Sequence, residues 1–485
     1  MRLLARWLLV SASVLGALLP FGAFVRPCHG GETKRPNIIF LLTDDQRWDT
    51  LGCMGNSIIQ TPNVDRLAAQ GVVFDHCFVT TSICMTNRAC IFTGQYAARH
   101  GVWDFRTIFS PEQLAQTYPG LLKRAGYYVG FIGKWGVGKP PDDLFDYNQG
   151  WPGQNRYYEK LKGEDPFEYL APGPDRKRLV ARQRDRVHLT ANMGDQALEF
   201  LDGAPADRPF CLAFSFKAPH CQDGQPAFRQ FPYDANLHGL YQDVTIPPAP
   251  LSDPAFFDAL PEFLKTSENR RRWELRFATP EMYQHSVKSY YRLVSGVDRV
   301  VGQIVEKLKE KGLADNTVIL YTGDNGFYLG ERGFAGKWFP HEVSIRVPLV
   351  VYDPRLPAAE RGTRRDEAVL SIDMAPTMLE MAGVEVPDAM QGRSLMPLVK
   401  GETPEWRTEF FYEHLFKHPT IPCSEAVRDS RYKYIRFVES DPLCEELYDL
   451  ESDPDEAHNL TNDPAHAETL ERMREKWTAW HQRAK

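Results

Sequence analysis

The sequence has 485 residues, of which 43% are hydrophobic and 25% are charged. These proportions are typical of a globular protein with a large buried core, and the length predicts one large domain with a smaller one, or two to three domains. The formal net charge of −7 argues against nucleic acid as the main partner, because neutralising phosphates requires a basic surface.

The N-terminus has the layout of a secretory signal. Arg2 and Arg6 precede the apolar run "WLLVSASVLGALLPFGAFV", and the polar segment "RPCHGGETKRP" follows it. We interpret residues 1–30 as a signal peptide or an N-terminal anchor. The anchor stays an alternative because no clean small-x-small cleavage site is present. The segment predicts export to a periplasm, the exterior or a lysosome-like lumen, with membrane contact only through a possible anchor.

Apolar strands alternate with amphipathic helices over residues 34–385, which we interpret as the main domain. Strands are predicted at "NIIFLLTDD", "VVFDHCFV", "GFIGKW", "CLAFSFKAPH" and "NTVILYTGDNG". Helices are predicted at "TPNVDRLAAQG", "TYPGLLKRAG" and "SYYRLVSGVDRVVGQIVEKLKEKG". Near-continuous apolar strands separated by helices predict an α/β fold with a large, mostly parallel sheet flanked by helices.

The pattern changes near residue 386. "RYKYIRF" and "EELYDL" resemble an antiparallel strand pair, and "PAHAETLERMREKWTAWHQRAK" predicts a closing helix. Residues 386–485 are therefore predicted to form a smaller α+β C-terminal subdomain. A proline-rich segment, 246–254, and the arginine-rich "ENRRRWELRF" lie in a long insertion before the longest predicted helix.

Polar residues end the predicted strands of the main sheet. Ligands collect beyond the carboxyl ends of strands in such sheets, so these side chains are expected on one rim. They are Asp44, Asp45, Lys134, His220, Asp324 and Asn325.

The acidic pairs on this rim offer only oxygen ligands. Two carboxylates about 4 Å apart repel each other by roughly 4 kcal/mol at an effective dielectric near 20, and a shared cation removes that repulsion. Coordination by oxygen alone favours a hard ion, Ca²⁺ or Mg²⁺. The predicted metal ligands are Asp44, Asp45, Asp324 and Asn325. The alternative is that these residues cap helices that follow the strands.

Three basic residues and a histidine are candidates for binding an anion beside that ion. Arg88, Lys134 and Lys337 would together form an anion cradle, although each alone could be a solvated surface charge. His220 has a side chain that can donate a proton near neutral pH, although an isolated histidine is more often structural.

In their order and spacing, these segments resemble the type I, formylglycine-dependent sulfatases of the alkaline phosphatase superfamily, from about residue 34 nearly to the C-terminus. The motifs that carry the resemblance include "NIIFLLTDD", "TPNVDRLAAQGVVF", the stretch "CMTNRACIFTG" from Cys84, "GFIGKW", "FSFKAPH", "TGDNGFYLGERG" and "SIDMAPTMLEMAG". The resemblance implies an alkaline phosphatase-like fold and hydrolysis of sulfate esters, and we expect the substrate to be a sulfated carbohydrate.

The resemblance also implies roles for individual residues. Cys84 is similar to the cysteine that a formylglycine-generating enzyme oxidises, and the hydrate of that aldehyde would attack sulfur. Arg88 would orient it. The four predicted ligands would hold Ca²⁺, with Mg²⁺ as an alternative. Sulfate contacts would come from Lys134, Lys337 and His220, and His220 or Lys337 would protonate the leaving alcohol.

This chain departs from the family pattern at three places. Thr86 and Asn87 stand where the family's Cys-x-Pro-Ser-Arg motif has Pro-Ser. Gly136 stands where its Gly-Lys-Trp-His motif has histidine, and Arg332 where many relatives have histidine. These departures leave open the alternative of an inactive glycan-binding pseudosulfatase. A phosphoesterase or phosphonate hydrolase of the same superfamily is a second alternative, because sulfate and phosphate esters share their shape.

Two further points concern Cys84 and two histidines near the C-terminus. Cys84 could instead form a disulfide with Cys90, but a helix that begins near Arg88 would point the two side chains apart. His414 and His418 lie in a segment that resembles the pocket border of carbohydrate-acting sulfatases, so either is a candidate for contact with a sugar.

Overall fold

The computed structural model describes residues 34–160 and 162–484, so the predicted signal peptide or anchor at residues 1–30 lies outside the described part. The central sheet has nine strands in the order β10-β2-β9-β6-β1-β5-β3-β4, with β11 also paired to β2. Strand β9 is antiparallel to both of its neighbours, and every other pair in this sheet is parallel. The strands are β1 (Asn37–Asp44), β2 (Val72–Phe78), β3 (Tyr128–Lys134), β4 (Tyr147–Trp151), β5 (Phe210–Pro219), β6 (Thr317–Gly323), β9 (Arg346–Tyr352), β10 (Thr363–Arg365) and β11 (Val369–Leu370).

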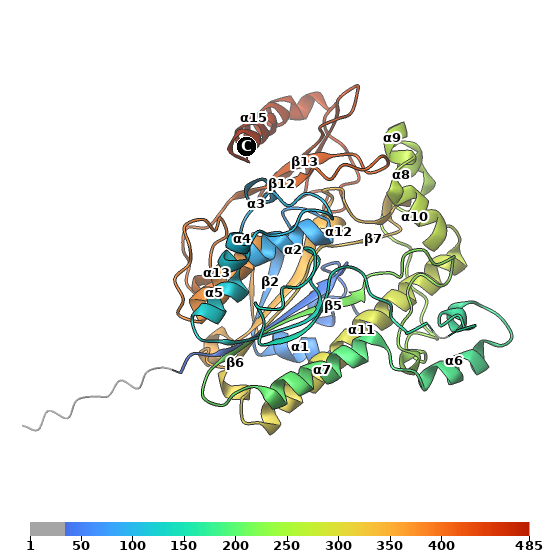
Figure 1. The fold of residues 1–485 in the computed structure, drawn as a ribbon. Coiled ribbons are helices and arrows are strands. Elements are labelled where there is room, and N and C mark those ends of the chain that lie inside the picture. Colours follow the sequence, from blue (N-terminus) through green and yellow to red (C-terminus); the bar gives the residue numbers. More distant parts are fainter. Residues whose placement is uncertain (1–33, 161, 485) are drawn as a thin grey trace, which may run out of the picture. The chain divides into compact units, whose positions relative to one another are not determined.

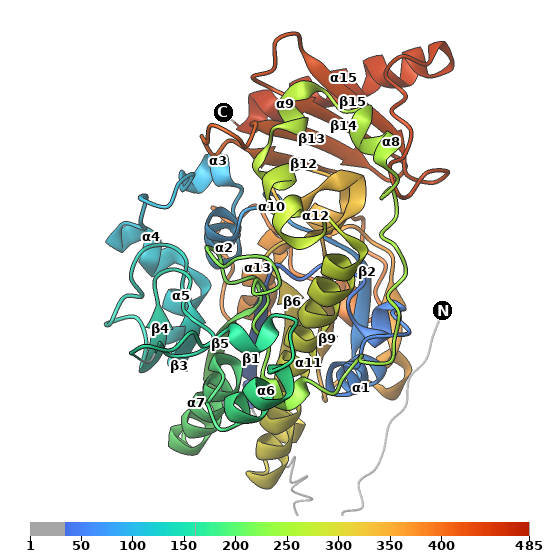
Figure 2. The ribbon, with the colours of Figure 1, turned by 90° about the vertical axis from the view of Figure 1, so that its right-hand side faces the viewer.

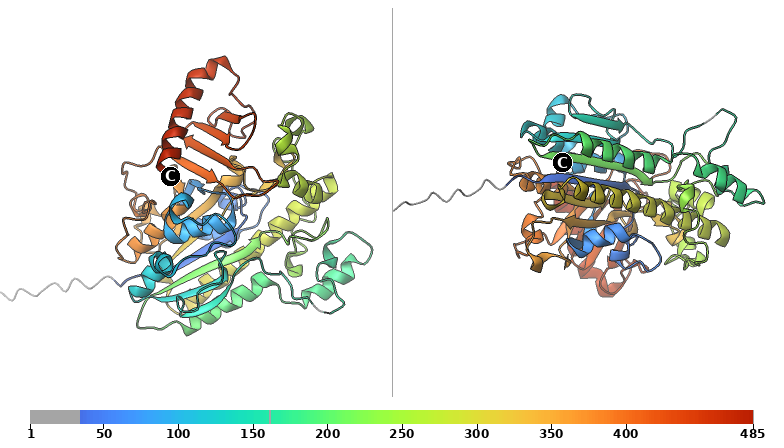
Figure 3. Two further views of the ribbon diagram at one scale, coloured as in Figure 1. Left: turned by 45° about the horizontal axis from the view of Figure 1, so that its top comes forward. Right: turned by 90° about the horizontal axis from the view of Figure 1, so that it is seen from below.

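Helices cover both faces of this sheet (Figures 1 and 3). In the central strand β1, Ile38 and Phe40 pack into the core on one face, whereas Ile39 and Leu41 pack into the core on the other. This explains the continuous apolar sequence and confirms the predicted mostly parallel α/β fold. One face carries α2 (Cys84–Thr93), α5 (Tyr118–Arg124) and α13 (Met374–Met381), and the other carries α1 (Pro62–Ala69), α7 (Leu189–Gly203) and α11 (Pro280–Glu310).

The N-terminus of α1 shows how the layers are joined. Pro62 occupies the first turn, but the preceding Thr61 makes no side-chain cap. Asp298 of α11 supplies the missing acceptor, because its Oδ1 accepts hydrogen bonds from the backbone N–H groups of Asn63 at 2.9 Å and Val64 at 2.8 Å. The two helices are thus tied through one carboxylate.

The insertion before α11 folds into three short helices, α8 (Pro254–Asp258), α9 (Glu262–Lys265) and α10 (Glu268–Arg276). Further short elements, apart from several 3-10 turns, are α3 (Ala97–His100), α4 (Pro111–Gln116), α6 (Arg176–Arg184), α12 (Glu342–Ile345), α14 (Met396–Val399) and the two-stranded pair β7 (Tyr328–Leu329) with β8 (Ala335–Gly336).

A second, antiparallel sheet follows near the C-terminus (Figure 2). Its order is β12 (Glu409–His414), β13 (Ser424–Asp429), β14 (Tyr432–Phe437), β15 (Cys444–Asp449), and α15 (Ala467–Ala484) packs against it. The predicted strand pair is confirmed as β14 and β15, with Tyr434 opposite Leu447. Its small core contains these two residues together with Val427, Leu470 and Met473. The boundary at residue 385 stays a prediction.

Candidate active site

The two acidic pairs meet because their strands are neighbours. Strands β1 and β6 are parallel, with Thr43 aligned to Gly323, so the residues that follow both strands leave the sheet at the same edge. Asp45 adopts a left-handed backbone conformation with φ 65°, which aspartate tolerates better than most residues. Its backbone N–H donates a hydrogen bond to Asp324 Oδ1 at 3.1 Å. The predicted rim therefore brings the acidic residues together.

The predicted cations contact these acids directly. Lys134 Nζ lies 2.6 Å from Asp44 Oδ2, and Arg88 Nε lies 2.9 Å from Asp324 Oδ2. Lys337 Nζ pairs with Asp45 Oδ1 and lies 3.8 Å from Asp44 Oδ1. All of these side chains are buried.

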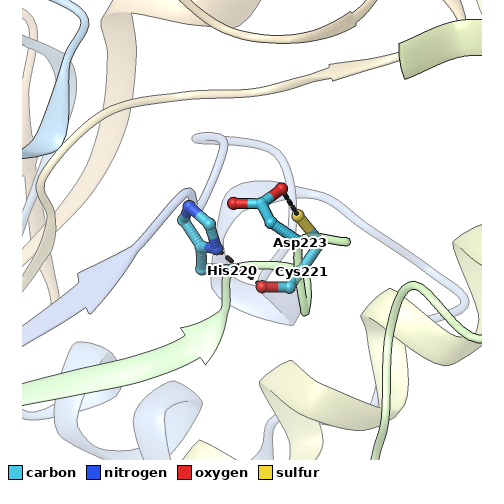
Figure 4. A group of neighbouring side chains, drawn as sticks. All are labelled: His220, Cys221 and Asp223. Atoms are coloured by element: carbon cyan, nitrogen blue, oxygen red, sulfur yellow. Dashed lines mark hydrogen bonds between the residues drawn. The ribbon is translucent and has the colours of Figure 1, made fainter. Parts of the chain in front are cut away.

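The histidine completes the group. His220 Nε2 lies 3.5 Å from Asp45 Oδ2, and its Nδ1 donates to the carbonyl oxygen of Cys221 at 2.7 Å, since a carbonyl can only accept (Figure 4). Figure 4 also shows the next contact in this turn, Cys221 Sγ to Asp223 Oδ1 at 3.1 Å. Burial lowers the pKa of His220. The turn after β5 therefore fixes which ring nitrogen faces the acids.

The surrounding cations compensate the negative charges of Asp44 and Asp324 to different extents. Burial opposes ionisation of Asp44, but Lys134, His220, Lys337 and Arg88 outweigh it and hold the pKa of that carboxyl well below its usual range. By contrast, burial and repulsion from Asp44 raise the pKa of Asp324 to about 6. Repulsion between the carboxylates thus persists despite the surrounding cations.

Unpartnered oxygens show that the acidic group fits a cation. Asp44 Oδ1 and Asn325 Oδ1 are buried, and neither has a hydrogen-bond partner among the described residues. The Asn325 amide nitrogen donates to Asp45 Oδ1 at 2.7 Å and to the carbonyl oxygen of Gly326 at 2.8 Å, which leaves its oxygen free. Buried polar atoms are rarely left unpaired, and carboxylate and amide oxygens suit a hard divalent ion. The residues present therefore fit Ca²⁺ or Mg²⁺.

Cys84 is the first residue of α2, which begins four residues before the predicted start near Arg88. Ligand atoms of Cys84, Asp44 and Asp324 all lie within 4.8 Å of one another. The thiol is free, and so is that of Cys90, which instead lies 3.3 Å from His100 Nε2. The prediction that these cysteines do not pair is confirmed, and Cys84 is placed against the acidic group.

The three departures from the family pattern have different surroundings. Gly136 has φ +88°, and a Cβ there would lie 2.7 Å from Arg88 Cδ, so the arginine occupies the space that a side chain would need. Asn87 Nδ2 donates to the carbonyl oxygen of Asp324 at 2.6 Å, whereas Thr86 Oγ1 is buried without a partner. Arg332 donates to the carbonyl oxygen of Glu456 and lines no part of the cavity described next.

A cavity of about 400 Å³ opens beside this group. Its lining includes Cys84, Lys134, Gly136, His220 and Lys337. The rest of its lining consists of aromatic, charged, polar and aliphatic side chains with a few small residues: Ile83, Phe105, Pro152, Gly153, Gln154, Asp223, Glu268, Arg272, Trp338, Phe416, His418 and Ile421.

Most of the remaining lining residues were not predicted from the sequence, and Gln154 and Arg272 are two of them. Gln154 donates to Asp44 Oδ2 at 3.0 Å from the loop after β4. Arg272 comes from the arginine-rich insertion, lies over the ring of Trp338 at 4.9 Å and pairs with Glu268. The arginine-rich composition of this insertion can be seen in the sequence, but no sequence pattern indicates that the insertion reaches the site. Of the two candidate histidines, His418 lines the cavity, whereas the buried His414 does not.

Comparison with known proteins gives the family. The sulfatase family matches residues 36–384, and the family described as N-sulphoglucosamine sulphohydrolase, C-terminal, matches residues 330–483. An N-acetylglucosamine-6-O-sulfatase of Bacteroides thetaiotaomicron is 32% identical over 88% of this chain and 83% of its own length. An arylsulfatase of Clostridium perfringens is 26% identical over 91% of this chain and 93% of its own length.

Solved structures agree with this result. One described as a complex with its substrate D-glucosamine-2-N,6-O-disulfate has a TM-score of 0.75 and 26% identity, and the match covers 93% of this chain and 98% of the other. A phosphonate monoester hydrolase from Silicibacter pomeroyi has a TM-score of 0.74 at 23% identity, which indicates a shared fold. Since the family match spans most of the described sequence, the chain belongs to the sulfatase family and is a sulfuric ester hydrolase.

Proposed function

We propose that this sulfatase removes sulfate from a sulfated carbohydrate, acting exolytically, and that a 6-O-sulfated glucosamine derivative is its first candidate substrate. The observation that carries the proposal is that one cavity is lined both by Cys84 with two lysines and a histidine and by three aromatic rings and several hydrogen-bonding side chains. The relative named N-acetylglucosamine-6-O-sulfatase and the structure with a glucosamine disulfate support the choice of sugar.

Among the residues that line this cavity, Lys134, Lys337 and His220 are proposed to bind the sulfate oxygens. Lys134 and Lys337 are held by Asp44 and Asp45, so their ammonium groups are fixed before an anion arrives. Fixed donors stabilise developing charge without reorganising during the reaction. His220 or Lys337 is the proposed proton donor to the leaving alcohol, because both line the cavity beside Cys84.

Asp44, Asp45, Asp324 and Asn325 are proposed to hold a divalent cation, with Ca²⁺ first and Mg²⁺ as the alternative. A cation there would lower the pKa of an adjacent hydroxyl and polarise the sulfate. The unpartnered oxygens of Asp44 and Asn325 support this assignment.

Cys84 is proposed to be converted to formylglycine by a formylglycine-generating enzyme. Once hydrated, the aldehyde supplies two hydroxyl groups on one carbon, one to attack sulfur and the other to release sulfate. Arg88 is proposed to orient this residue, because it lies one helical turn away and its NH1 donates to the carbonyl oxygen of Lys134 at 2.7 Å.

The aromatic and polar residues that line the same cavity are proposed to hold the sugar ring. Phe105, Trp338 and Phe416 offer flat apolar surfaces, and Gln154, Arg272 and His418 offer polar groups for hydroxyls. A volume of about 400 Å³ lies in the usual range for small-molecule sites.

Turnover of a panel of sulfate esters tests the proposal. The panel contains glucosamine and N-acetylglucosamine 6-sulfates, other sulfated sugars, an aryl sulfate, choline sulfate, alkyl sulfates and a phosphonate monoester. The expected result is release of sulfate from a sulfated sugar by the wild-type protein and none by Cys84→Ala. Turnover of choline or alkyl sulfates with no activity on any sulfated sugar contradicts the proposal, and preferential phosphonate hydrolysis favours the alternative chemistry.

Export is also part of the proposal. The charged and apolar N-terminal sequence supports it, and among the relatives is one named extracellular sulfatase SULF-1 homolog, from Drosophila melanogaster. Within residues 34–160 and 162–484, no helix combines the length and apolarity needed to cross a bilayer. Fractionation of cells that make the full chain tests this, since retention in the cytoplasm would contradict it.

A further inference from the structure

A second hollow, which we call the basic groove, lies between α6, the first turns of α11 and the loop after β5, and it shares no lining residue with the cavity at Cys84. Its volume is about 710 Å³. Figures 1 and 2 show α6 well away from the C-terminal sheet. The groove is lined by Pro172, Gly173, Pro174, Arg176, Lys177, Phe228, His238, Gln242, Glu281, Gln284, His285, Lys288 and Arg292.

The lining has an excess of positive charge. Four side chains are cationic, namely Arg176, Lys177, Lys288 and Arg292, against the single carboxylate of Glu281. None of the four cations forms a salt bridge within the described part of the chain, although the protein as a whole carries a formal net charge of −7. On a protein with a net negative charge, basic side chains are usually paired with carboxylates. Four cations without such partners in one groove therefore favour the binding of an anion that the protein itself does not supply.

Arg292 is the strongest single indication. It is only 4% exposed, its Nε has no hydrogen-bond partner, and it is held in place by donation from NH2 to the carbonyl oxygen of Leu240 at 2.5 Å. The guanidinium also lies 4.7 Å from the centre of the Tyr233 ring. A buried guanidinium without a carboxylate is costly unless something else compensates its charge.

The positive charge in the groove also contributes to lowered pKa values of two other groups that line it. Burial, then Arg176 and Arg292, lower the pKa of His238 to about 4. Burial and Arg292 likewise lower the pKa of Lys288. A bound anion would relieve this repulsion.

We propose that the basic groove is a second anion-binding site, which holds sulfated units of a glycan chain at a distance from the reaction centre. The inference rests on the proposed function, since it takes the carbohydrate substrate to be a sulfated oligosaccharide or polymer. Arginine and lysine suit sulfate groups, and a groove larger than the reactive cavity suits more than one sugar unit. Binding there would raise the local concentration of chain ends near the cavity.

The test measures binding to the full chain in a Cys84→Ala background, which prevents turnover. The probe is a fluorescent sulfated oligosaccharide of several units, with its desulfated counterpart and inorganic sulfate as comparisons. The Lys177→Gln/Lys288→Gln pair removes two cations at the surface of the groove. Arg178→Gln removes one cation from the same helix at a position that does not line the groove. Thermal unfolding midpoints equal to that of the parent protein establish that the variants fold.

The paired variant is expected to bind the sulfated oligosaccharide about tenfold more weakly than the parent, and Arg178→Gln to bind it within about twofold. Equal affinities for all three proteins would overturn the proposal. Binding of inorganic sulfate as tight as that of the oligosaccharide would instead assign a free-anion site and would also overturn it. Turnover of an aryl sulfate by the wild-type protein is measured separately, so a failure of the proposed chemistry is distinguishable from a failure of the groove.

Discussion

Replacing Gly136 is predicted to damage the site even when the family's histidine is restored there. The backbone at this position has φ +88°, which costs a residue with a side chain about 1–2 kcal/mol. In addition, a Cβ would lie 2.7 Å from Arg88 Cδ, which is closer than real contacts allow. Arg88 cannot move aside cheaply, because its Nε is bonded to Asp324 Oδ2 at 2.9 Å and its NH1 to the carbonyl oxygen of Lys134.

Overpacking of this kind typically costs about 1–3 kcal/mol, so Gly136→His and Gly136→Ala are each expected to lower the free energy of unfolding by about 2–5 kcal/mol. Displacement of Arg88 should also reduce kcat on an aryl sulfate. Gly153→Ala is the matched control, since Gly153 also lines the cavity and a Cβ there meets nothing within 4 Å. Unfolding midpoints and kcat are measured for all three. A Gly136→His protein that is as stable as Gly153→Ala and as active as the wild type would refute the reasoning.

Three further predictions concern the metal, the helix layers and pH. Asn325→Ala should weaken binding of Ca²⁺ by roughly tenfold or more, because it removes an unpartnered buried oxygen. Calorimetry on chelator-treated protein measures this affinity, and an unchanged affinity would exclude Asn325 as a ligand. Asp298→Ala should cost about 2–3 kcal/mol in urea unfolding because two backbone N–H groups of α1 lose their acceptor, and a cost below about 0.5 kcal/mol would contradict the capping role. Burial, then Glu425, raise the pKa of Glu413 to about 7, above its ordinary value near 4.5, so its contribution to stability is complete below about pH 4.5 and is lost as the pH rises through 7. Glu413→Gln should therefore unfold with a weaker dependence on pH between 5 and 8 than the wild type, and equal pH profiles would count against this assignment.

The fold was largely predictable because its signals are local. The apolar run from Ile38 to Leu42 is buried on both faces of the sheet, and that environment produces a continuous apolar strand. The acids after β1 and β6 were also predictable as a group, since parallel neighbours end at one edge. The predicted start of α2 was wrong by one turn, because no capping side chain marks Cys84 and the helix begins after the extended Ile83.

The remainder of the site depends on contacts between distant segments. Gln154 reaches Asp44 across 110 residues of sequence, and Arg272 reaches the cavity from an insertion whose path no local pattern specifies. The fit of Gly136 against Arg88 likewise depends on how α2 packs against the end of β3, which the sequence does not encode locally. Such positions are set by tertiary packing, so the structure was needed to find them.

The most direct test of the central claim is the mass of the tryptic peptide 67–88, from protein made together with a formylglycine-generating enzyme. This peptide contains Cys84, the Thr86-Asn87 departure and a second cysteine, Cys77, which serves as an internal comparison. The account predicts that Cys84 is converted to the aldehyde while Cys77 stays a thiol. A peptide in which both cysteines are unmodified, from protein that still hydrolyses sulfate esters, would contradict the account.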